Sequence, residues 1–115
     1  MIMKDKEVKI KLSFDEKGMP AKMWWSSTDD KKDTAPEMKA MFLSMFDKDT
    51  KDTLKLDLWT KDFQMNEMDR FVYHTIRSLA DSYVKATNNK ELANDMQRFA
   101  EYFGQKTEIL AKPEK

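Results

Sequence analysis

The sequence contains no cysteine, which excludes disulfide bonds, thiolate metal sites and cysteine nucleophiles together. It also holds only two glycines and a single histidine. Two glycines cannot form a glycine-rich phosphate-binding loop, and one histidine has no second histidine with which to share a metal ion. The lack of cysteine fits a reducing compartment. No motif for metal or phosphate-loop chemistry is therefore indicated.

An excess of charge of one sign is lacking as well, because 21 basic residues balance 21 acidic ones. Both halves of the chain are balanced, so neither resembles the polybasic modules of nucleic-acid-binding proteins. The longest uncharged run, Ala40 to Phe46, is far shorter than the ~18 residues that a membrane-spanning helix needs. The N-terminus becomes charged at Lys4 and lacks the apolar core of a secretory signal. We therefore expect a soluble, cytoplasmic protein without a membrane-inserted segment.

Charge and methionine are what the sequence has in quantity. Charged residues make up 37% of the 115 residues, yet the zero net charge means that the chain does not repel itself open. Ten methionines, three tryptophans and three tyrosines add apolar bulk. The length suits one hydrophobic core. We expect residues 1–115 to form a single domain.

The beginning of the chain alternates apolar and polar residues with the period of a half-buried strand. Val8 to Phe14 alternates strictly, and Asp15 to Gly18 supplies a turn in which Gly18 can adopt a positive φ. Met19 to Ser26 continues as a second strand, and Pro20 places its start at a sheet edge or a bulge. These residues predict a β-hairpin.

Two further strands are expected before the pattern changes. The polar stretch 27–37 is typical of a solvated loop. Met38 to Phe46 is apolar on both faces, as in a strand covered on both sides, and Leu54 to Trp59 alternates again. Residues of about 5–60 therefore predict a four-stranded antiparallel meander.

From about residue 66 to 111 the apolar period becomes 3.6 residues, which indicates two amphipathic helices. Asn66 is the expected N-cap of the first, and Asn88-Asn89 separates it from the second. Gly104 is expected to weaken the second helix by roughly 1 kcal/mol relative to alanine. The predicted fold class is α+β with the order ββββαα. The first apolar stripe comprises Met68, Phe71, Val72, Thr75, Ile76, Leu79, Ala80 and Tyr83, and the second comprises Leu92, Met96, Phe99, Phe103 and Leu110.

Few residues are candidates for chemistry. His74 falls on the polar side of the first helix, and we expect it at the surface rather than in a catalytic role. Asp47, Asp49 and Asp52 could attract Ca²⁺, yet they lack the glycine and the distal glutamate of an EF-hand loop. The pair Asp29-Asp30, like the acidic residues at 15 and 16, stands in a turn. We interpret all of these carboxylates as turn residues and expect no cofactor and no metal.

The predicted outward face of the sheet is too apolar to be solvated. If the opposite face, with Leu54, Leu56 and Leu58 among its members, covers the first helix, the outward face carries tryptophans and methionines among lysines. Three interpretations stay open: the second helix or an identical chain covers this face, a different protein docks on it, or lysines and tryptophans bind unpaired nucleic acid. The candidate interface residues are Trp24, Met41, Leu43, Met45 and Trp59, and the candidate basic contacts are Lys9, Lys11, Lys22, Lys39 and Lys55. The residues placed on the opposite face are Val8, Ile10, Leu12, Phe14, Met23, Trp25, Phe42, Phe46, Leu54, Leu56 and Leu58.

Four stretches of the chain form a recognisable pattern. The most specific is Leu56-Asp57-Leu58-Trp59-Thr60-Lys61-Asp62, which leads into Glu67-Met68 and Phe71. The others are Asp15-Glu16 followed by Met19-Pro20, Trp25 followed by Thr28-Asp29, and Ser44 to Asp47. In these residues the sequence resembles the GldC family of gliding motility proteins of Bacteroidetes bacteria. Gln64 stands where a proline is expected in that family.

The resemblance implies a small soluble protein from the gene set for surface gliding, a movement tied to the type IX secretion apparatus. It implies no enzyme and supplies no catalytic residues. Two interpretations of Trp59 to Asp62 stay open: these residues close the fourth strand and set the helix angle, or Trp59 anchors a partner from the gliding machinery.

The first hypothesis is therefore a non-enzymatic accessory protein of gliding motility that acts through protein–protein contacts and forms a homo-oligomer. The alternative comes from another class, because ββββα is also the element order of PUR repeats and Whirly proteins, which bind single-stranded nucleic acid. That likeness is one of fold alone. An enzyme would require a conversion that depends on His74.

Overall fold

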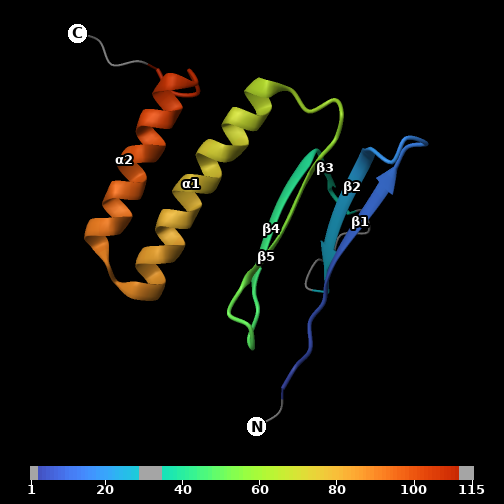
Figure 1. Cartoon of the computed structure of the whole chain (residues 1–115), viewed down its shortest axis with the longest axis horizontal. Coiled ribbons are helices and arrows are strands. Elements are labelled where there is room, and N and C mark those ends of the chain that lie inside the picture. The colour runs from blue at the N-terminus through green and yellow to red at the C-terminus, as the bar shows by residue number, and fades with distance from the viewer. Residues whose placement is uncertain (1–2, 29–34, 112–115) are drawn as a thin grey trace. The chain divides into compact units, whose positions relative to one another are not determined.

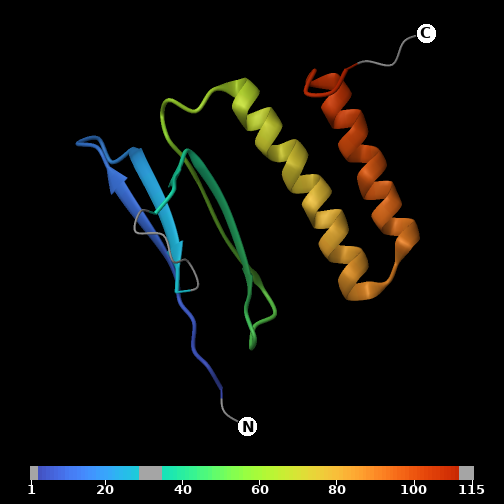
Figure 2. The same ribbon diagram turned by 180° about the vertical axis from the view of Figure 1, so that it is seen from behind.

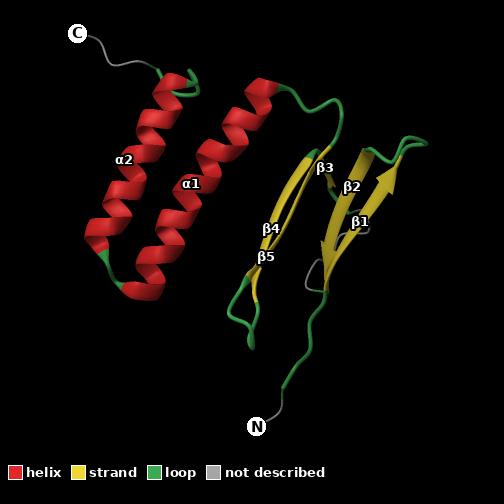
Figure 3. Cartoon of the chain, in the orientation of Figure 1, coloured by secondary structure: helices red, strands yellow, loops and turns green. Residues whose placement is uncertain are grey.

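The structure is a computed structural model that describes residues 3–28 and 35–111. It has an α+β fold, as expected, with antiparallel strands before two helices (Figure 3). The chain divides into a strand unit that ends at Phe63 and a helical unit that begins at Gln64. The elements are β1 (Val8–Phe14), β2 (Pro20–Ser27), β3 (Glu37–Met38), β4 (Ala40–Phe46), β5 (Thr53–Trp59), α1 (Met65–Thr87) and α2 (Lys90–Lys106).

The predicted four-stranded meander is wrong in one respect, because the third strand is divided at Lys39. Met38 pairs with Met23 of β2, whereas the chain from Ala40 onward pairs with β5. The Lys39 carbonyl already accepts a hydrogen bond from the Thr60 backbone N–H at 2.8 Å. The strand thus changes its partner at this bend, and the result is a three-stranded sheet of β1-β2-β3 and a two-stranded sheet of β4-β5.

The first hairpin forms as the sequence predicts. Gly18 has φ of 78°, and Oδ1 of Asp15 accepts hydrogen bonds from the backbone N–H groups of Lys17 and Met19, each at 2.9 Å. The pairing register shifts between Ser13 and Phe14, where the latter faces Pro20, so the proline sits at a β-bulge. The predicted loop 27–37 lies largely outside the described residues, which omit 29–34.

The buried centre of the strand unit is Met23, whose side chain is 1% exposed. The two sheets lie next to each other in both views of the chain (Figure 1, Figure 2). A cleft of 270 Å³ opens between them. Its lining is almost wholly apolar and comes from both sheets: Val8, Ile10, Met23, Trp24, Trp25, Met38, Ala40, Met41, Phe42 and Leu43.

The N-cap of the first helix lies two residues before the expected one. Gln64 rather than Asn66 is the N-cap of α1, and the Glu67 carboxylate accepts a hydrogen bond from the Gln64 backbone N–H at 3.1 Å. The predicted break at Asn88-Asn89 is confirmed. Asn88 ends α1 with φ of 58°, and Oδ1 of Asn89 caps α2 by accepting the Leu92 N–H at 3.1 Å.

The buried residues of the two helices are Tyr73 and four small residues, and of these five only Ala80 belongs to a predicted apolar stripe. Tyr73 and Ala80 are the buried residues of α1, and Ala93, Ala100 and Gly104 are those of α2. Small side chains let two helix backbones approach closely, so the large residues of each stripe are displaced to one side of the contact. Leu79, Leu92 and Phe99, which were expected to be covered, are each about half exposed. No helix of the described residues is long and apolar enough to cross a membrane.

Gly104 is a packing requirement and not the weak point that its helix propensity suggests. A Cβ at this position would lie 2.8 Å from Cε1 of Tyr73 and 2.8 Å from Cδ1 of Leu110. The expected extent of the second helix is also wrong, since α2 ends at Lys106. Glu108 then adopts φ of 64°, and the Leu110 N–H donates to the Gly104 carbonyl at 3.0 Å, so the chain folds back over the glycine.

Candidate functional site

The β4–β5 hairpin has two different faces, and they are not the faces that the sequence pattern predicts. The turn of residues 47–52 pairs Phe46 with Thr53, and this register sets Met45, Leu43 and Met41 opposite Leu54, Leu56 and Leu58. A shift of one residue in register moves a whole row of side chains to the other face. Met41, Leu43 and Met45 of β4 therefore share a face with the three leucines of β5. Trp59 lies on the other face. We call this face, made of Met41, Leu43, Met45, Leu54, Leu56 and Leu58, the leucine face.

The opposite side of the hairpin carries Trp59 together with aromatic and charged residues. The ammonium of Lys55 lies 2.9 Å from Oδ2 of Asp57 and 5.8 Å from the ring centroid of Phe42. Oδ1 of Asp57 is buried and receives no hydrogen bond from the described residues. The Trp59 side chain is 48% exposed. We call this side, made of Phe42, Phe46, Lys55, Asp57 and Trp59, the tryptophan face.

The remaining candidate residues lie on the other sheet or at its border. The register of β1 and β2 places Lys11 opposite Trp24 and Lys9 opposite Ser26, and Lys22 follows on the same face, opposite Ser13. The fifth lysine, at position 39, stands at the bend between β3 and β4. The candidate residues are divided between the two sheets. Trp24, Met41 and Leu43 meet at the cleft between the sheets, whereas Trp59 lies on the other side of the β4–β5 hairpin from the two residues of β4.

The segment after Trp59 is held in place by its own polar groups. Thr60 is 3% exposed, its hydroxyl donates to Oδ1 of Asp62, and its carbonyl accepts the Phe63 N–H at 3.0 Å. The hydrogen bond from Thr60, followed by the positive charge of Lys39, lowers the pKa of Asp62 below its ordinary value. Buried polar groups of this kind are normally paired, so the threonine and the aspartate fix the exit of β5.

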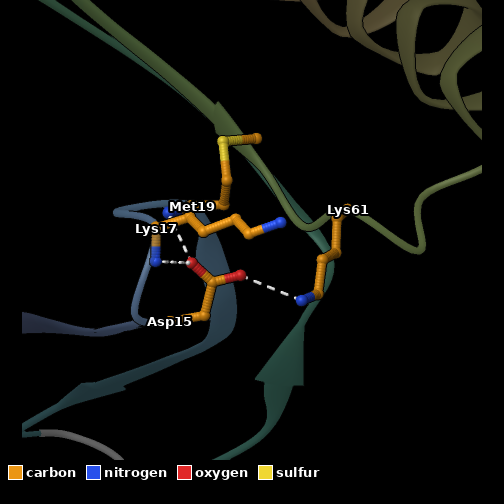
Figure 4. A network of polar contacts seen from close by, with 4 residues as sticks. All are labelled: Asp15, Lys17, Met19 and Lys61. Carbon is orange, nitrogen blue, oxygen red and sulfur yellow. Dashed lines mark hydrogen bonds and ion pairs between the residues drawn. The ribbon is translucent and has the colours of Figure 1, made fainter.

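Lys61 ties this exit to the first hairpin, 46 residues earlier in the sequence. Its ammonium donates to Oδ2 of Asp15 at 2.9 Å, while Oδ1 of the same carboxylate accepts the two backbone N–H groups of the β1–β2 turn (Figure 4). These contacts lower the pKa of Asp15 below 3.8, with the hydrogen bond from Lys61 as the largest cause and that from the Met19 N–H next. Two of the sequence stretches that carry the family resemblance thus meet at one junction.

This junction makes stability depend on pH. The folded pKa of Asp15 lies below its ordinary value of 3.8, so its contribution to stability is present above that pH and is lost as the pH falls through the folded pKa. We expect the urea midpoint of unfolding to fall as the pH is lowered below about 4. Asp15→Asn should have a lower urea midpoint than the native chain at pH 6. Its midpoint should also fall less steeply as the pH is lowered.

The matched control for this prediction is Glu16→Gln, which removes an exposed carboxylate from the same turn. It should keep the midpoint of the native chain at pH 6. Equal pH profiles for the native chain and Asp15→Asn would contradict the assigned role of Asp15.

The residues considered for catalysis or metal binding, His74 and Asp47, contact neighbouring residues of their own helix or turn. His74 is exposed, and its ring meets the Tyr73 ring edge-on with 5.0 Å between centroids. Oδ1 of Asp47 accepts the Asp49 N–H at 2.9 Å and the Thr50 N–H at 2.8 Å, so this carboxylate serves the β4–β5 turn. These hydrogen bonds lower the pKa of Asp47, that from Thr50 most. Asp29-Asp30 lies outside the described residues.

Sequence reasoning missed two features. The first is the unbonded Asp57 carboxylate oxygen, for which only the side-chain geometry gives a signal. The second is an apolar groove of 410 Å³ along the two helices. Its signal was present in the two apolar stripes, the first of which was assigned to the contact with the sheet. The groove is lined by Ile76, Tyr83, Leu92, Asp95, Met96 and Phe99.

Comparison with known proteins shows to which family the chain belongs. No curated protein and no solved structure matches the chain. The family described as "Gliding motility-associated protein GldC-like" matches residues 20–109. That range contains β2 to β5, the whole β5 exit from Trp59 to Asp62 and both helices. The chain therefore belongs to the GldC-like family of gliding motility-associated proteins.

Proposed function

We propose that this chain serves gliding motility without catalysing a reaction, by binding other protein chains through its β4–β5 hairpin. Membership of the GldC-like family supports the link to gliding. The non-catalytic part is supported by the use of the polar groups, because Asp15, Asp47 and Asp62 are each engaged in holding turns or the β5 exit.

The observation that carries the proposal is the contrast within Trp59-Thr60-Lys61-Asp62. The last three residues are held in the junction by hydrogen bonds, whereas Trp59 is about half exposed at the end of β5. A structural role at the junction therefore explains Thr60, Lys61 and Asp62. It does not explain why a tryptophan stands exposed at position 59. Exposed tryptophan is among the residue types that contribute most to protein interfaces.

Asp57 adds a second feature of the same face. Its buried Oδ1 receives no hydrogen bond from the described residues, and its other oxygen is bound to Lys55. An unsatisfied buried acceptor is costly, and an N–H or O–H donor from a bound chain would satisfy it. Asp57 lies two residues from Trp59 on the same face, so a partner that covers Trp59 also covers the Asp57 side chain, and its donor reaches the buried Oδ1 only when that side chain turns outward.

The leucine face is proposed to serve self-association. Met45, Leu54 and Leu56 are each about half exposed there, and the face carries no charged side chain. A solvated apolar row of this kind is what a second chain buries in a homodimer. The hairpin thus offers one apolar face and one mixed face with an aromatic anchor.

Trp59→Ala is expected to weaken binding through the hairpin by at least about 30-fold, the loss typical of a buried interface tryptophan. Light scattering at micromolar concentration should give the native chain a mass above 13.7 kDa. Self-association is assigned to the leucine face, so Trp59→Ala should keep this mass, whereas Leu56→Lys, which places a charge on that face, should approach the monomer mass.

The matched control is Tyr102→Ala, which removes an aromatic side chain that is 56% exposed on α2. It should leave the mass unchanged, and circular dichroism should show both variants folded. A native chain of 13.7 kDa would refute self-association. Equal effects of Trp59→Ala and Tyr102→Ala on the capture of a different protein chain would refute the special role of Trp59.

A further inference from the structure

The outer face of β1 and β2 is hollowed into a trough that the proposed protein contact does not use. A depression of 780 Å³ is lined by lysines and tryptophans, and a smaller one of 220 Å³ adjoins it, because the two share Lys9 and Ser26. The larger volume lies within the range of small-ligand sites, about 300–1,000 Å³. We call the two depressions the β1–β2 trough; it is lined by Glu7, Lys9, Ile10, Lys11, Trp24, Trp25, Ser26, Ser27, Thr28 and Ala35.

The strand register concentrates cations around one aromatic ring in this trough. Lys11 lies opposite Trp24, and its ammonium is 5.4 Å from the centroid of that ring. Lys9 lies one pair further along on the same face, opposite Ser26. Lys22 extends the row in the other direction, opposite Ser13. The face thus presents three ammonium groups beside an indole ring.

Among the described residues, the acidic side chains of Glu7 and Glu37 lie near the trough and define what a ligand must displace. Glu7 lies 3.8 Å from the ammonium of Lys9, and both side chains are largely exposed. Glu37 lies opposite Trp24 on β3. Exposed ion pairs contribute little to stability, so an anion that reaches Lys9 replaces the Glu7 carboxylate at small cost.

We propose that the β1–β2 trough binds a nucleobase together with its phosphate, from a free nucleotide or from an unpaired nucleic-acid strand. The base stacks on Trp24, Lys9 and Lys11 hold the phosphate, and the hydroxyls at 26–28 donate hydrogen bonds to the phosphate or the sugar. An acidic peptide would use the lysines but would leave the aromatic floor without a planar partner. The trough is on the β1–β2–β3 sheet, so this inference stands apart from the contact proposed for β4–β5.

The test is fluorescence anisotropy of a labelled 12-nucleotide thymidine strand with the full chain. Binding is expected at 50 mM salt and should weaken about sevenfold at 200 mM salt if two lysines each neutralise one phosphate. Lys9→Glu and Lys11→Glu should each weaken binding at least tenfold, and Trp24→Ala roughly tenfold through lost stacking. Lys48→Glu makes the same charge change in the exposed β4–β5 turn and should leave binding unchanged.

Competition identifies the source of the ligand and can overturn the inference. If adenosine monophosphate displaces the strand, the trough takes free nucleotide, and if only oligonucleotides displace it, the trough takes an unpaired strand. Equal displacement by polyglutamate would show simple polyanion binding and overturn the inference. So would the absence of binding at 50 mM salt or an equal loss with Lys48→Glu. Trp59→Ala should leave nucleotide binding intact, because Trp59 lies outside the trough. A failure of the nucleotide proposal can therefore be told apart from a failure of the proposed protein contact.

Discussion

Met23→Ala is expected to lower the free energy of unfolding by about 2–5 kcal/mol, the largest effect of any single substitution considered. Met23 is the largest fully buried side chain among the described residues. It pairs with Met38 across β2 and β3 and lines the cleft between the two sheets. Truncation removes apolar contacts and enlarges that cleft at the same time. Urea unfolding followed by circular dichroism measures the change.

Two further methionine variants test whether the loss of stability depends on the burial of Met23. Met19→Ala removes a side chain that is 48% exposed in the same hairpin and should cost less than about 1 kcal/mol. Met23→Leu keeps most of the volume and should cost less than about 1.5 kcal/mol, which keeps the comparison measurable if the alanine variant does not fold. Equal losses for Met19→Ala and Met23→Ala would contradict the assignment of Met23 as the centre of the strand unit.

Gly104→Ala is expected to destabilise the chain by about 1–3 kcal/mol, although alanine is the better helix former by roughly 1 kcal/mol. The added Cβ would lie 2.8 Å from Cε1 of Tyr73, a residue that is 4% exposed. Steric overlap therefore outweighs helix propensity. Thermal unfolding followed by circular dichroism at 222 nm, a wavelength that reports helix, gives the size of the loss.

A double-mutant cycle separates the two neighbours of Gly104. Leu110→Ala removes the side-chain atoms responsible for two of the three close contacts, so the cost of Gly104→Ala should be smaller in that background. Lys106→Ala, an exposed substitution two residues away in the same helix, should change stability by less than about 0.5 kcal/mol. A more stable Gly104→Ala variant would refute the close packing of α1 and α2 at this point.

Much of the fold follows from local patterns in the sequence. The bounds of β1, the Gly18 turn and the break at Asn88-Asn89 are fixed by periodicity and by residues that tolerate a positive φ. The bulge at Pro20 follows from the missing N–H of proline. Each of these features depends on a few neighbouring residues, which is why sequence reasoning reaches them.

The features that sequence reasoning missed depend on distant partners. No glycine or proline marks the bend at Lys39, which arises because β3 pairs with β2 and β4 with β5. The faces of the β4–β5 hairpin depend on which residue opposes Phe46, and apolar residues on both sides of β4 give no preference for one register. The helix contact was missed because Ala93, Ala100 and Gly104 attract less notice in a pattern than the large residues beside them.

The candidate site was predicted in part for the same reason. Trp59 was identified from the sequence, but its neighbours on the tryptophan face follow only from the hairpin register. The structural role of Thr60, Lys61 and Asp62 became visible once Lys61 was placed against Asp15. These contacts give Thr60, Lys61 and Asp62 a structural role that Trp59, which is about half exposed, does not share.

The most direct test of the proposed protein contact is photo-crosslinking from residue 59 in living cells of the organism from which the chain comes. Benzoylphenylalanine at position 59 keeps an aromatic ring at the end of β5, and the same group at position 102 gives a matched exposed control on α2. The proposal predicts an adduct heavier than the 13.7 kDa chain from position 59 and none of that mass from position 102. An adduct of twice the chain mass would identify a second copy, and any other mass a different protein. Absence of an adduct from position 59, or the same adduct from both positions, would contradict the proposal.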